Sequence, residues 1–229
     1  YYDSFLYKNE FENANLLETI NYSIANNLVE PYFQAIMDNT NDKIVKYEAL
    51  MRIFDKNGNI VMPNVFIHKA KKYRLYNKLM ELLFNKIIVY ILRYKIHVSI
   101  NLDYIDILNP YIKKTLISKI KNHNIGSYLT LEILESEKVS NFNIVNDFIA
   151  EVKKYGVKIA IDDFGTGFSN YENILNLNID YIKIDGSLIK KIDEDIYLNL
   201  IKSIVLFSKQ QKIKVVAEFV SDLKILRYV

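Results

Sequence analysis

Acidic, amide and lysine side chains recur at or near the ends of short apolar segments along this chain of 229 residues. In chain order these side chains are Gln34, Glu48, Asn101, Glu132, Asp162 with Asp163, Lys183 with Asp185, and Glu218. Crowded carboxylates repel one another unless a cation neutralises them, and hard oxygen ligands suit Mg²⁺ or Mn²⁺. Two such ions about 3.5 to 4 Å apart would hold the attacking water and the leaving oxygen of a phosphodiester. The adjacent Asp162 and Asp163 suit that arrangement, since one carboxylate could bridge both ions while the other binds only the second.

Each of these side chains also has an ordinary structural explanation when it is taken alone. A single glutamate in a strand, such as Glu132, is more often an edge or surface residue, and a single asparagine is more often a turn residue. Lys183 could extend along the surface. In a strand buried on both faces, however, a lysine needs a partner, which favours a place beside the carboxylates. The repetition of one acid or amide at each successive strand end favours a shared site.

A parallel α/β fold is the arrangement that would bring these residues together. Apolar, β-branched segments at 29–37, 44–53, 98–102, 129–134, 157–161, 181–184 and 213–217 are predicted strands. Helical periodicity covers 5–28, 65–73, 78–94, 112–120, 144–154 and 196–209. The turn-rich loop 38–42 predicts that the first two strands form an antiparallel hairpin. Every later connection contains a helix-length segment.

This alternation predicts a parallel sheet, either an open doubly wound sheet or a (β/α) barrel. No glycine-rich turn follows the early strands, so the dinucleotide-binding version of the open sheet lacks its motif. In a closed barrel the carboxyl ends of all strands meet at one rim, where barrel enzymes build their sites. Residues far apart in the sequence would then form one ring.

The composition excludes several other classes of protein. The chain is 50% hydrophobic and 25% charged, which is ordinary for a globular protein and unlike a disordered one. It has no cysteine, which removes thiolate metal sites and thiol catalysis and fits a cytoplasmic location. The basic residues are spread along the chain with a net charge of +3, so DNA is not an expected partner. We find no leader and no apolar run long enough to cross a bilayer.

Glu48-Ala49-Leu50, followed by Arg52, resembles the signature of the EAL-domain family of cyclic di-GMP phosphodiesterases. Further segments match in family order: Tyr32-Phe33-Gln34-Ala35-Ile36, Ser99-Ile100-Asn101-Leu102, Leu131 to Ser136, Asp162 to Gly167, Lys183-Ile184-Asp185 and Val216-Ala217-Glu218. The three-letter signature alone is weak, whereas the full ordered set is very specific.

The resemblance implies a modified TIM (β/α)8 barrel with an antiparallel first strand, and hydrolysis of cyclic di-GMP to the linear dinucleotide pGpG. It implies that one metal ion is bound by Glu48, Asn101, Glu132 and Asp162, and that Asp162, Asp163 and Glu218 serve a second ion or its water. Lys183 would hold and help activate the attacking water, so that Lys183, Glu218 and Glu48 count as catalytic. The substrate groove would be lined by Gln34, Leu50 and Arg52. We expect Mg²⁺ or Mn²⁺ to support the reaction and Ca²⁺ to inhibit it.

The same resemblance assigns a supporting role to the loop after Asp163. Glu135 would brace this loop, whose family motif contains Gly165, Thr166, Gly167 and Ser169. In the family the loop lies close to a dimer interface, so we expect a homodimer. We also expect a sensory or diguanylate-cyclase-like domain to precede this segment in the parent protein.

The chain departs from the family near its end. The family often has Ala-Glu-Gly-Val-Glu, where this chain has Ala217-Glu218-Phe219-Val220-Ser221. We expect Phe219 to be tolerated because it alters no ligand, whereas Ser221 removes a carboxylate near the substrate. We further expect a lead-in helix or linker over residues 1–28 and a domain over 29–229 that stops before its eighth strand and final helix. These departures leave an alternative open, a catalytically weak EAL domain that serves as a cyclic di-GMP receptor or regulatory module.

Overall fold

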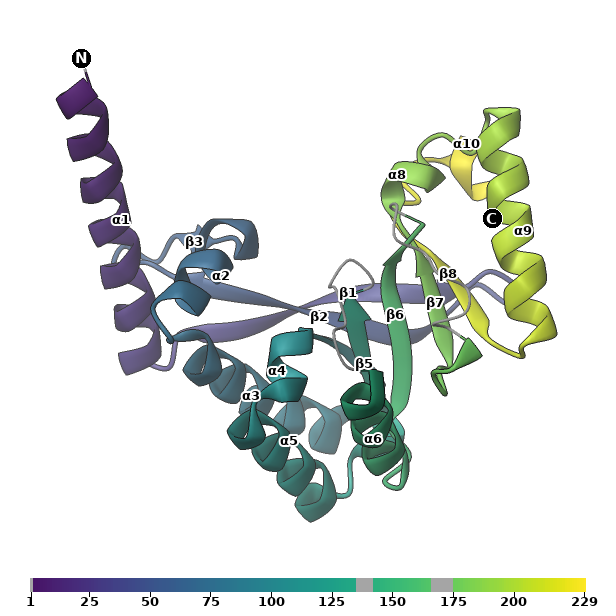
Figure 1. Ribbon diagram of the computed structural model, residues 1–229, viewed down its shortest axis with the longest axis horizontal. Coiled ribbons are helices and arrows are strands. Elements are labelled where there is room, and N and C mark those ends of the chain that lie inside the picture. The colour runs from purple at the N-terminus through teal and green to yellow at the C-terminus, as the bar shows by residue number, and fades with distance from the viewer. Residues whose placement is uncertain (1, 135–141, 166–174) are drawn as a thin grey trace. The chain divides into compact units, whose positions relative to one another are not determined.

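The computed structural model of the chain describes residues 2–134, 142–165 and 175–229 (Figure 1). The contacts divide the chain into two compact units. The first unit contains Tyr1–Ile36 and Tyr47–Ile96, and the second contains Met37–Lys46 and His97–Val229.

The first unit combines an antiparallel strand arrangement with three helices. Its elements are α1 (Tyr2–Ala25), most of β1 (Val29–Asp38) and β2 (Lys43–Phe54), the short β3 (Ile60–Val61), α2 (Pro63–Lys72) and α3 (Tyr76–Tyr94). β1 and β2 are neighbours joined by the predicted hairpin loop, and β3 pairs antiparallel with β2. The buried Ser23 of α1 donates its hydroxyl to the Phe54 carbonyl at 2.6 Å and accepts from the Phe54 N–H at 3.0 Å. The end of the lead-in helix is therefore anchored to β2.

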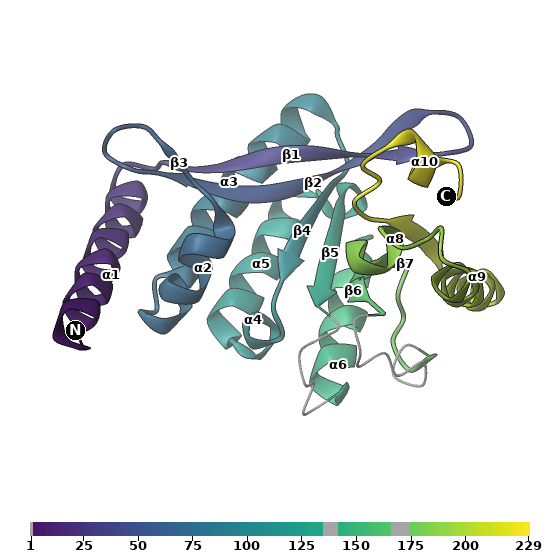
Figure 2. The same ribbon diagram turned by 90° about the horizontal axis from the view of Figure 1, so that it is seen from above.

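The second unit is built on parallel strands that follow one another in chain order. Its strands are β4 (Val98–Leu102), β5 (Leu129–Leu134), β6 (Lys158–Phe164), β7 (Tyr181–Ile184) and β8 (Lys214–Ala217). Its helices are α4 (Tyr104–Leu108), α5 (Pro110–His123), the 3₁₀ turn η1 (Gly126–Tyr128), α6 (Phe142–Lys153), α8 (Gly186–Ile189), α9 (Asp195–Gln210) and α10 (Leu223–Leu226). Figure 2, like Figure 1, shows α9 beside β8 within this unit. All residues of β4 and β5 except Asn101 and Leu134 are buried, which fits strands covered on both faces.

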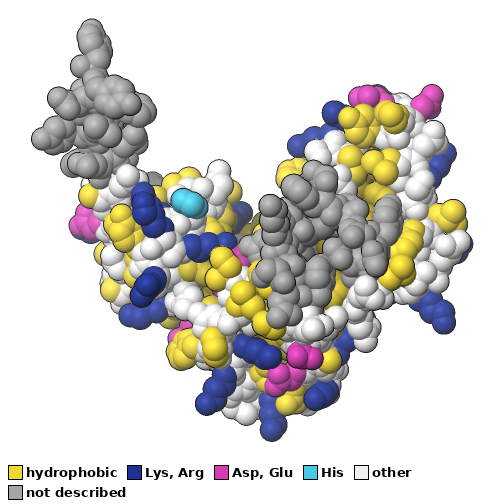
Figure 3. Space-filling model, viewed as in Figure 1, with side chains coloured by type: hydrophobic (Ala, Val, Ile, Leu, Met, Phe, Trp, Pro, Cys, Tyr) yellow, Lys and Arg dark blue, Asp and Glu magenta, His cyan; other side chains and the backbone are white. Residues whose placement is uncertain are grey.

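The predicted fold class, an α/β fold of the modified TIM type with an antiparallel first strand, is confirmed. Every predicted strand is present, with bounds that differ by at most a few residues, and so is every predicted helix. The pattern missed β3 and the short helices α4, α8 and α10, because two to five residues are too few to establish a period. Among the described residues, no helix combines the length and the apolar character that a membrane span requires. On the face drawn in Figure 3, Lys and Arg side chains are scattered and do not gather into one patch.

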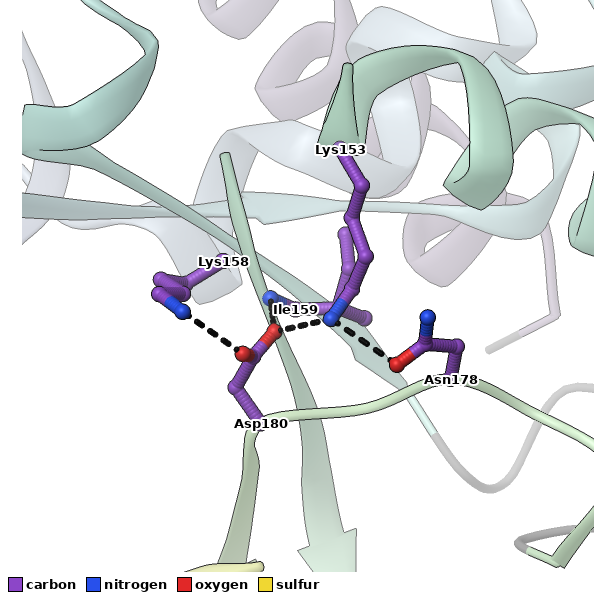
Figure 4. A network of polar contacts seen from close by, with 5 residues as sticks. All are labelled: Lys153, Lys158, Ile159, Asn178 and Asp180. Atoms are coloured by element: carbon purple, nitrogen blue, oxygen red, sulfur yellow. Dashed lines mark hydrogen bonds and ion pairs between the residues drawn. The ribbon is translucent and has the colours of Figure 1, made fainter. Parts of the chain in front are cut away.

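A charged network ties together the amino-terminal ends of β6 and β7 (Figure 4). Asp180, just before β7, accepts from Lys153 Nζ at 2.7 Å, Lys158 Nζ at 3.0 Å and the Ile159 N–H at 2.9 Å. Lys153 also donates to Asn178 Oδ1 at 3.1 Å. Burial raises the pKa of Asp180, but these hydrogen bonds outweigh it and hold that pKa below its usual value. We call these five residues the lower network.

Candidate functional site

Lys183 of β7 lies at the centre of a buried cluster of carboxylates. Its Nζ is 2.6 Å from Glu132 Oε2, 2.9 Å from Asp162 Oδ1 and 2.8 Å from Glu218 Oε1. The lysine side chain is only 2% exposed, and the three carboxylate side chains are 0%, 9% and 16% exposed. We call Lys183, these three residues and Asp163 the upper cluster.

The strand register explains why residues from four segments meet at one lysine. In β5 and β6, Glu132 pairs with Ala160 and Leu134 pairs with Asp162. In β7 and β8, Ile184 pairs with Ala217, directly before Glu218. Each carboxylate thus comes from near the carboxyl end of its strand, as the sequence pattern predicted for a shared rim.

The two adjacent aspartates owe their common direction to an irregularity in β6. The pairing of β6 with β7 shifts register between Ile161 and Phe164, and Asp163 has a left-handed φ of 56°. In a regular strand, consecutive side chains point to opposite faces. A bulge interrupts this alternation and can re-aim a side chain. Carboxylate oxygens of Asp162, Asp163 and Glu218 consequently lie within 4.8 Å of one another.

This donor set fits a small divalent cation. Around Mg²⁺, with oxygen ligands at about 2.1 Å, two ligand atoms lie at most about 4.2 Å apart. The spacing of the three carboxylates within 4.8 Å is close to that limit, and all the donors are hard oxygens. The upper cluster holds four carboxylates and one ammonium, so its formal charge is −3. Cations would neutralise the excess, and the residues present therefore fit the predicted metal centre.

Asn101 and Asp185 are the other two polar residues that the sequence placed at strand ends of this unit. Asn101 in β4 pairs in register with Glu132 and is half-buried, so its position is next to the cluster. Asp185 does not join the cluster, because its carboxylate accepts from the Ser187 N–H at 2.8 Å and caps α8. An N-cap aspartate is a common structural feature, and the sequence alone did not separate this role from that of a site residue.

The remaining predicted residues of the site belong to the first unit. Glu48, Leu50 and Arg52 lie on β2 and are half-buried, and Gln34 lies on β1 and is exposed. The Arg52 guanidinium donates to the Met51 carbonyl at 2.9 Å and lies 5.6 Å from the centre of the Tyr32 ring. Their roles beside the upper cluster stay predictions.

The loop that was predicted to support the site is only partly described. Glu135, Thr166, Gly167 and Ser169 lie outside the described residues. Gly165 has a φ of +100°, and a Cβ at this position would lie 2.4 Å from Leu188 Cδ1. A side chain here would strain the backbone and would also have to displace Leu188, which explains one glycine of the motif.

The two departures from the family motif that follow Glu218 differ in their surroundings. Phe219 follows it with a left-handed φ of 50°, and its ring lies against Gly186 at the start of α8. The glycine in the family's motif was the available signal, because a position that usually holds glycine often has a positive φ. Ser221, the other departure, is exposed.

Comparison with known proteins identifies the family. A family model described as EAL domain matches residues 17–229. The cyclic di-GMP phosphodiesterase PdeA of Borreliella burgdorferi is 34% identical over 97% of this chain and 35% of that protein. The probable cyclic di-GMP phosphodiesterase PdeA of Escherichia coli K12 is 38% identical over 53% of this chain and 17% of that protein. The chain belongs to the EAL domain family, and it spans about a third or less of the length of these relatives.

Solved structures agree with this assignment. An EAL domain protein from Listeria monocytogenes EGD-e aligns with a TM-score of 0.83 and 25% identity, covering 92% of this chain and 85% of that one. The FimX EAL domain from Pseudomonas aeruginosa, bound to c-di-GMP, aligns with a TM-score of 0.85 and 20% identity over 93% and 89% of the two chains. At this identity, the second match supports the fold alone.

Proposed function

We propose that this domain hydrolyses one phosphodiester of cyclic di-GMP to give pGpG and that it needs a divalent cation to do so. The observation that carries the proposal is the upper cluster, in which one buried lysine contacts three carboxylates at the rim of a parallel sheet. Its excess negative charge calls for cations, and phosphodiester hydrolysis is chemistry that bound cations serve well. The activity named for the relatives from Borreliella burgdorferi and Escherichia coli agrees with it.

The roles divide between two groups of ligands. Asp162, Asp163 and Glu218 would hold one ion, and the second would be held by Glu48, Asn101 and Glu132 together with Asp162. When bound, such ions lower the pKa of water and stabilise charge on the phosphoryl oxygens. Mg²⁺ or Mn²⁺ suits this donor set, and the looser coordination of Ca²⁺ would inhibit.

The protein's own side chains supply positioning. The Lys183 ammonium is positioned by its three carboxylate contacts. It has three N–H donors, so it would exchange one of these contacts for a hydrogen bond to the attacking water once cations bind the carboxylates. Glu218, 2.8 Å from that ammonium, would accept a proton or a hydrogen bond from the same water. The Arg52 guanidinium would pair with a phosphate of the substrate, while Gln34 and Leu50 would line the groove.

The test is to incubate the protein with cyclic di-GMP and follow pGpG by chromatography with Mg²⁺, Mn²⁺, Ca²⁺ or a chelator. We expect product with Mg²⁺ or Mn²⁺ and none with Ca²⁺ or the chelator. Glu132→Gln, which keeps the size of a buried cluster residue, should abolish turnover. Lys113→Met is the matched control, because this lysine of α5 forms a surface ion pair with Glu151. Binding of cyclic di-GMP without any product would contradict the proposal.

The predicted homodimer, the predicted sensory or diguanylate-cyclase-like domain of the parent protein and the cytoplasmic location stay proposals. Light scattering with and without cyclic di-GMP measures the oligomeric state directly, and a monomer in both conditions would contradict the dimer.

A further inference from the structure

Phe219 adopts a backbone conformation that phenylalanine rarely takes. Its φ is 50°, in the left-handed region, where a Cβ crowds the following carbonyl group. Its side chain is no core residue either, since Phe219 is 62% exposed. A large exposed ring at a strained position needs a compensating contact.

The ring makes that contact with Gly186, the first residue of α8. A Cβ placed on Gly186 would lie 2.2 Å from Phe219 Cδ2 and 2.7 Å from Cγ, so the ring occupies the space that any other residue would fill. On another side, Lys190 Nζ lies 4.5 Å from the ring centre, within the range of a cation–π contact. The ring thus contacts the backbone at the start of α8 and the lysine that directly follows this helix.

Glu218 needs restraint on both sides of its backbone. Its carboxylate lies 2.8 Å from Lys183 Nζ and within 4.8 Å of oxygens of Asp162 and Asp163, which repel it. Before it, the sheet ladder ends with the Glu218 N–H donating to the Ile184 carbonyl at 3.2 Å. Directly after it, the chain enters the left-handed turn at Phe219 and leaves the sheet.

We propose that Phe219 is a positioning residue, whose ring anchors the chain on Gly186 and thereby keeps the Glu218 carboxylate in the metal-binding cluster. The inference rests on the proposed function of Glu218 and adds to it a side chain that touches neither substrate nor metal. It agrees with the expectation that Phe219 alters no ligand, and it gives the ring a role that the sequence did not suggest. A glycine at this position would leave the backbone flexible, whereas the Phe219 ring makes a specific contact with Gly186.

The first experiment compares Phe219→Gly with Phe219→Tyr. Glycine removes the ring and also relieves the left-handed strain, so we expect a melting temperature within about 2 °C of the original. We expect kcat to fall about tenfold with little change in KM, because a small misplacement of a reacting group costs rate. The Mn²⁺ dissociation constant, measured by calorimetry without substrate, should rise about tenfold. Tyrosine keeps the ring, so Phe219→Tyr should keep the original melting temperature, kcat and Mn²⁺ dissociation constant.

A merely structural role would lower the melting temperature together with the activity, whereas positioning separates the two. Unchanged kcat and unchanged Mn²⁺ affinity in Phe219→Gly would overturn the inference. A wild-type protein that binds Mn²⁺ but makes no pGpG would overturn the proposed function only, since the Mn²⁺ measurement still decides whether Phe219 positions Glu218.

The second experiment uses Gly186→Ala to displace the ring from the other side. The new Cβ collides with the ring, so the single variant should lose Mn²⁺ affinity about as strongly as Phe219→Gly. In the double variant there is no ring to displace, and Gly186→Ala should add no further loss. Such non-additivity is the signature of two residues acting through one contact. Losses that simply add would overturn the inference.

Discussion

The strand β7 lies between two charged networks whose net formal charges have opposite signs. Just before its start, the single carboxylate of Asp180 accepts from two lysines and a backbone N–H. Near its end, the single ammonium of Lys183 contacts three carboxylates, with Asp163 also close by. The lower network therefore has more positive than negative charge around a satisfied acid, while the upper cluster carries a formal charge of −3.

We expect this difference to distinguish a structural network from the proposed metal-binding one. Asp180 has a hydrogen-bond donor on each carboxylate oxygen, and its own backbone N–H and carbonyl also bond to Ile159 and Lys214. Such an arrangement stabilises the fold without any ligand. Several buried carboxylates around one lysine instead keep an excess charge that costs stability until cations bind. We therefore expect a site where buried acids keep an excess of charge at the carboxyl end of a parallel sheet, and none where a single acid has all its hydrogen bonds satisfied at the opposite end.

The largest expected effect comes from removing the centre of the upper cluster. Lys183→Met keeps the length of the side chain but leaves the carboxylates without their ammonium. We expect kcat for pGpG formation to fall about a thousandfold, equivalent to about 4 kcal/mol of barrier, with a smaller change in substrate affinity. Steady-state kinetics at saturating Mg²⁺ measures both values.

The matched variant is Lys153→Met in the lower network. It should keep kcat within about twofold, because the hydrogen bonds that its ammonium makes within the described part of the chain go to Asp180 and Asn178. Equal losses of kcat in the two variants would remove the functional distinction between the networks. Circular dichroism spectra confirm that both proteins are folded under the assay conditions.

The next effect in size concerns the lower network and is one of stability. Asp180→Asn keeps the shape of the side chain but removes the charge that pairs with Lys153 and Lys158. We expect the free energy of unfolding to fall by about 2 kcal/mol, in the range for hydrogen bonds to charged groups. Urea unfolding measures this loss, and pGpG formation per folded molecule should be unchanged.

The pH dependence of the same variant gives a further check. The pKa of Asp180 is lowered in the folded protein, so its contribution to stability is complete above the unfolded pKa of about 3.9. It is lost as the pH falls below that value and through the lower folded pKa. The original protein and Asp180→Asn should therefore become more alike in stability under strongly acidic conditions. A difference that stays constant down to such pH would contradict the assigned charge contacts.

The fold was predictable because its signals repeat along the chain. Strand segments such as 98–102 and 129–134 are short, apolar and β-branched. Each is separated from the next by a segment with helical periodicity that is long enough to form a helix. The site residues of the second unit were also visible, since parallel strands must bring their carboxyl ends to one edge.

What the sequence could not show depends on single backbone angles and on helix caps. Asp185 and Asp163 look alike as acids at strand ends, but one caps α8 and the other joins the cluster through a bulge. The Phe219 ring contacts Gly186, which lies 33 positions earlier in the chain, and a single sequence gives no indication of that contact. These features are set by packing in three dimensions.

A smaller effect is expected from Mg²⁺ on stability. A ligand that binds only the folded state stabilises by RT ln(1 + [L]/Kd), which is about 1.4 kcal/mol at ten times the dissociation constant. We expect Mg²⁺ to raise the melting temperature of the original protein and of Asp180→Asn equally. The variant Asp162→Asn should respond much less, because it removes a carboxylate of the upper cluster. A calorimetric scan with Mg²⁺ and with chelator shows whether the ion acts at that cluster.

The smallest expected effect is that of Asp163→Asn on stability, and its sign is opposite to that of Asp180→Asn. Asp163→Asn removes one negative charge from the upper cluster, and asparagine tolerates the left-handed φ of this position well. Without metal we expect the free energy of unfolding to rise by about 0.5 kcal/mol, because repulsion between half-buried carboxylates is relieved. The same change of acid to amide at Asp180 lowers it. Urea unfolding in chelator measures both, and a loss of stability in Asp163→Asn would mean that this carboxylate supports the metal-free fold and does not add to an excess charge.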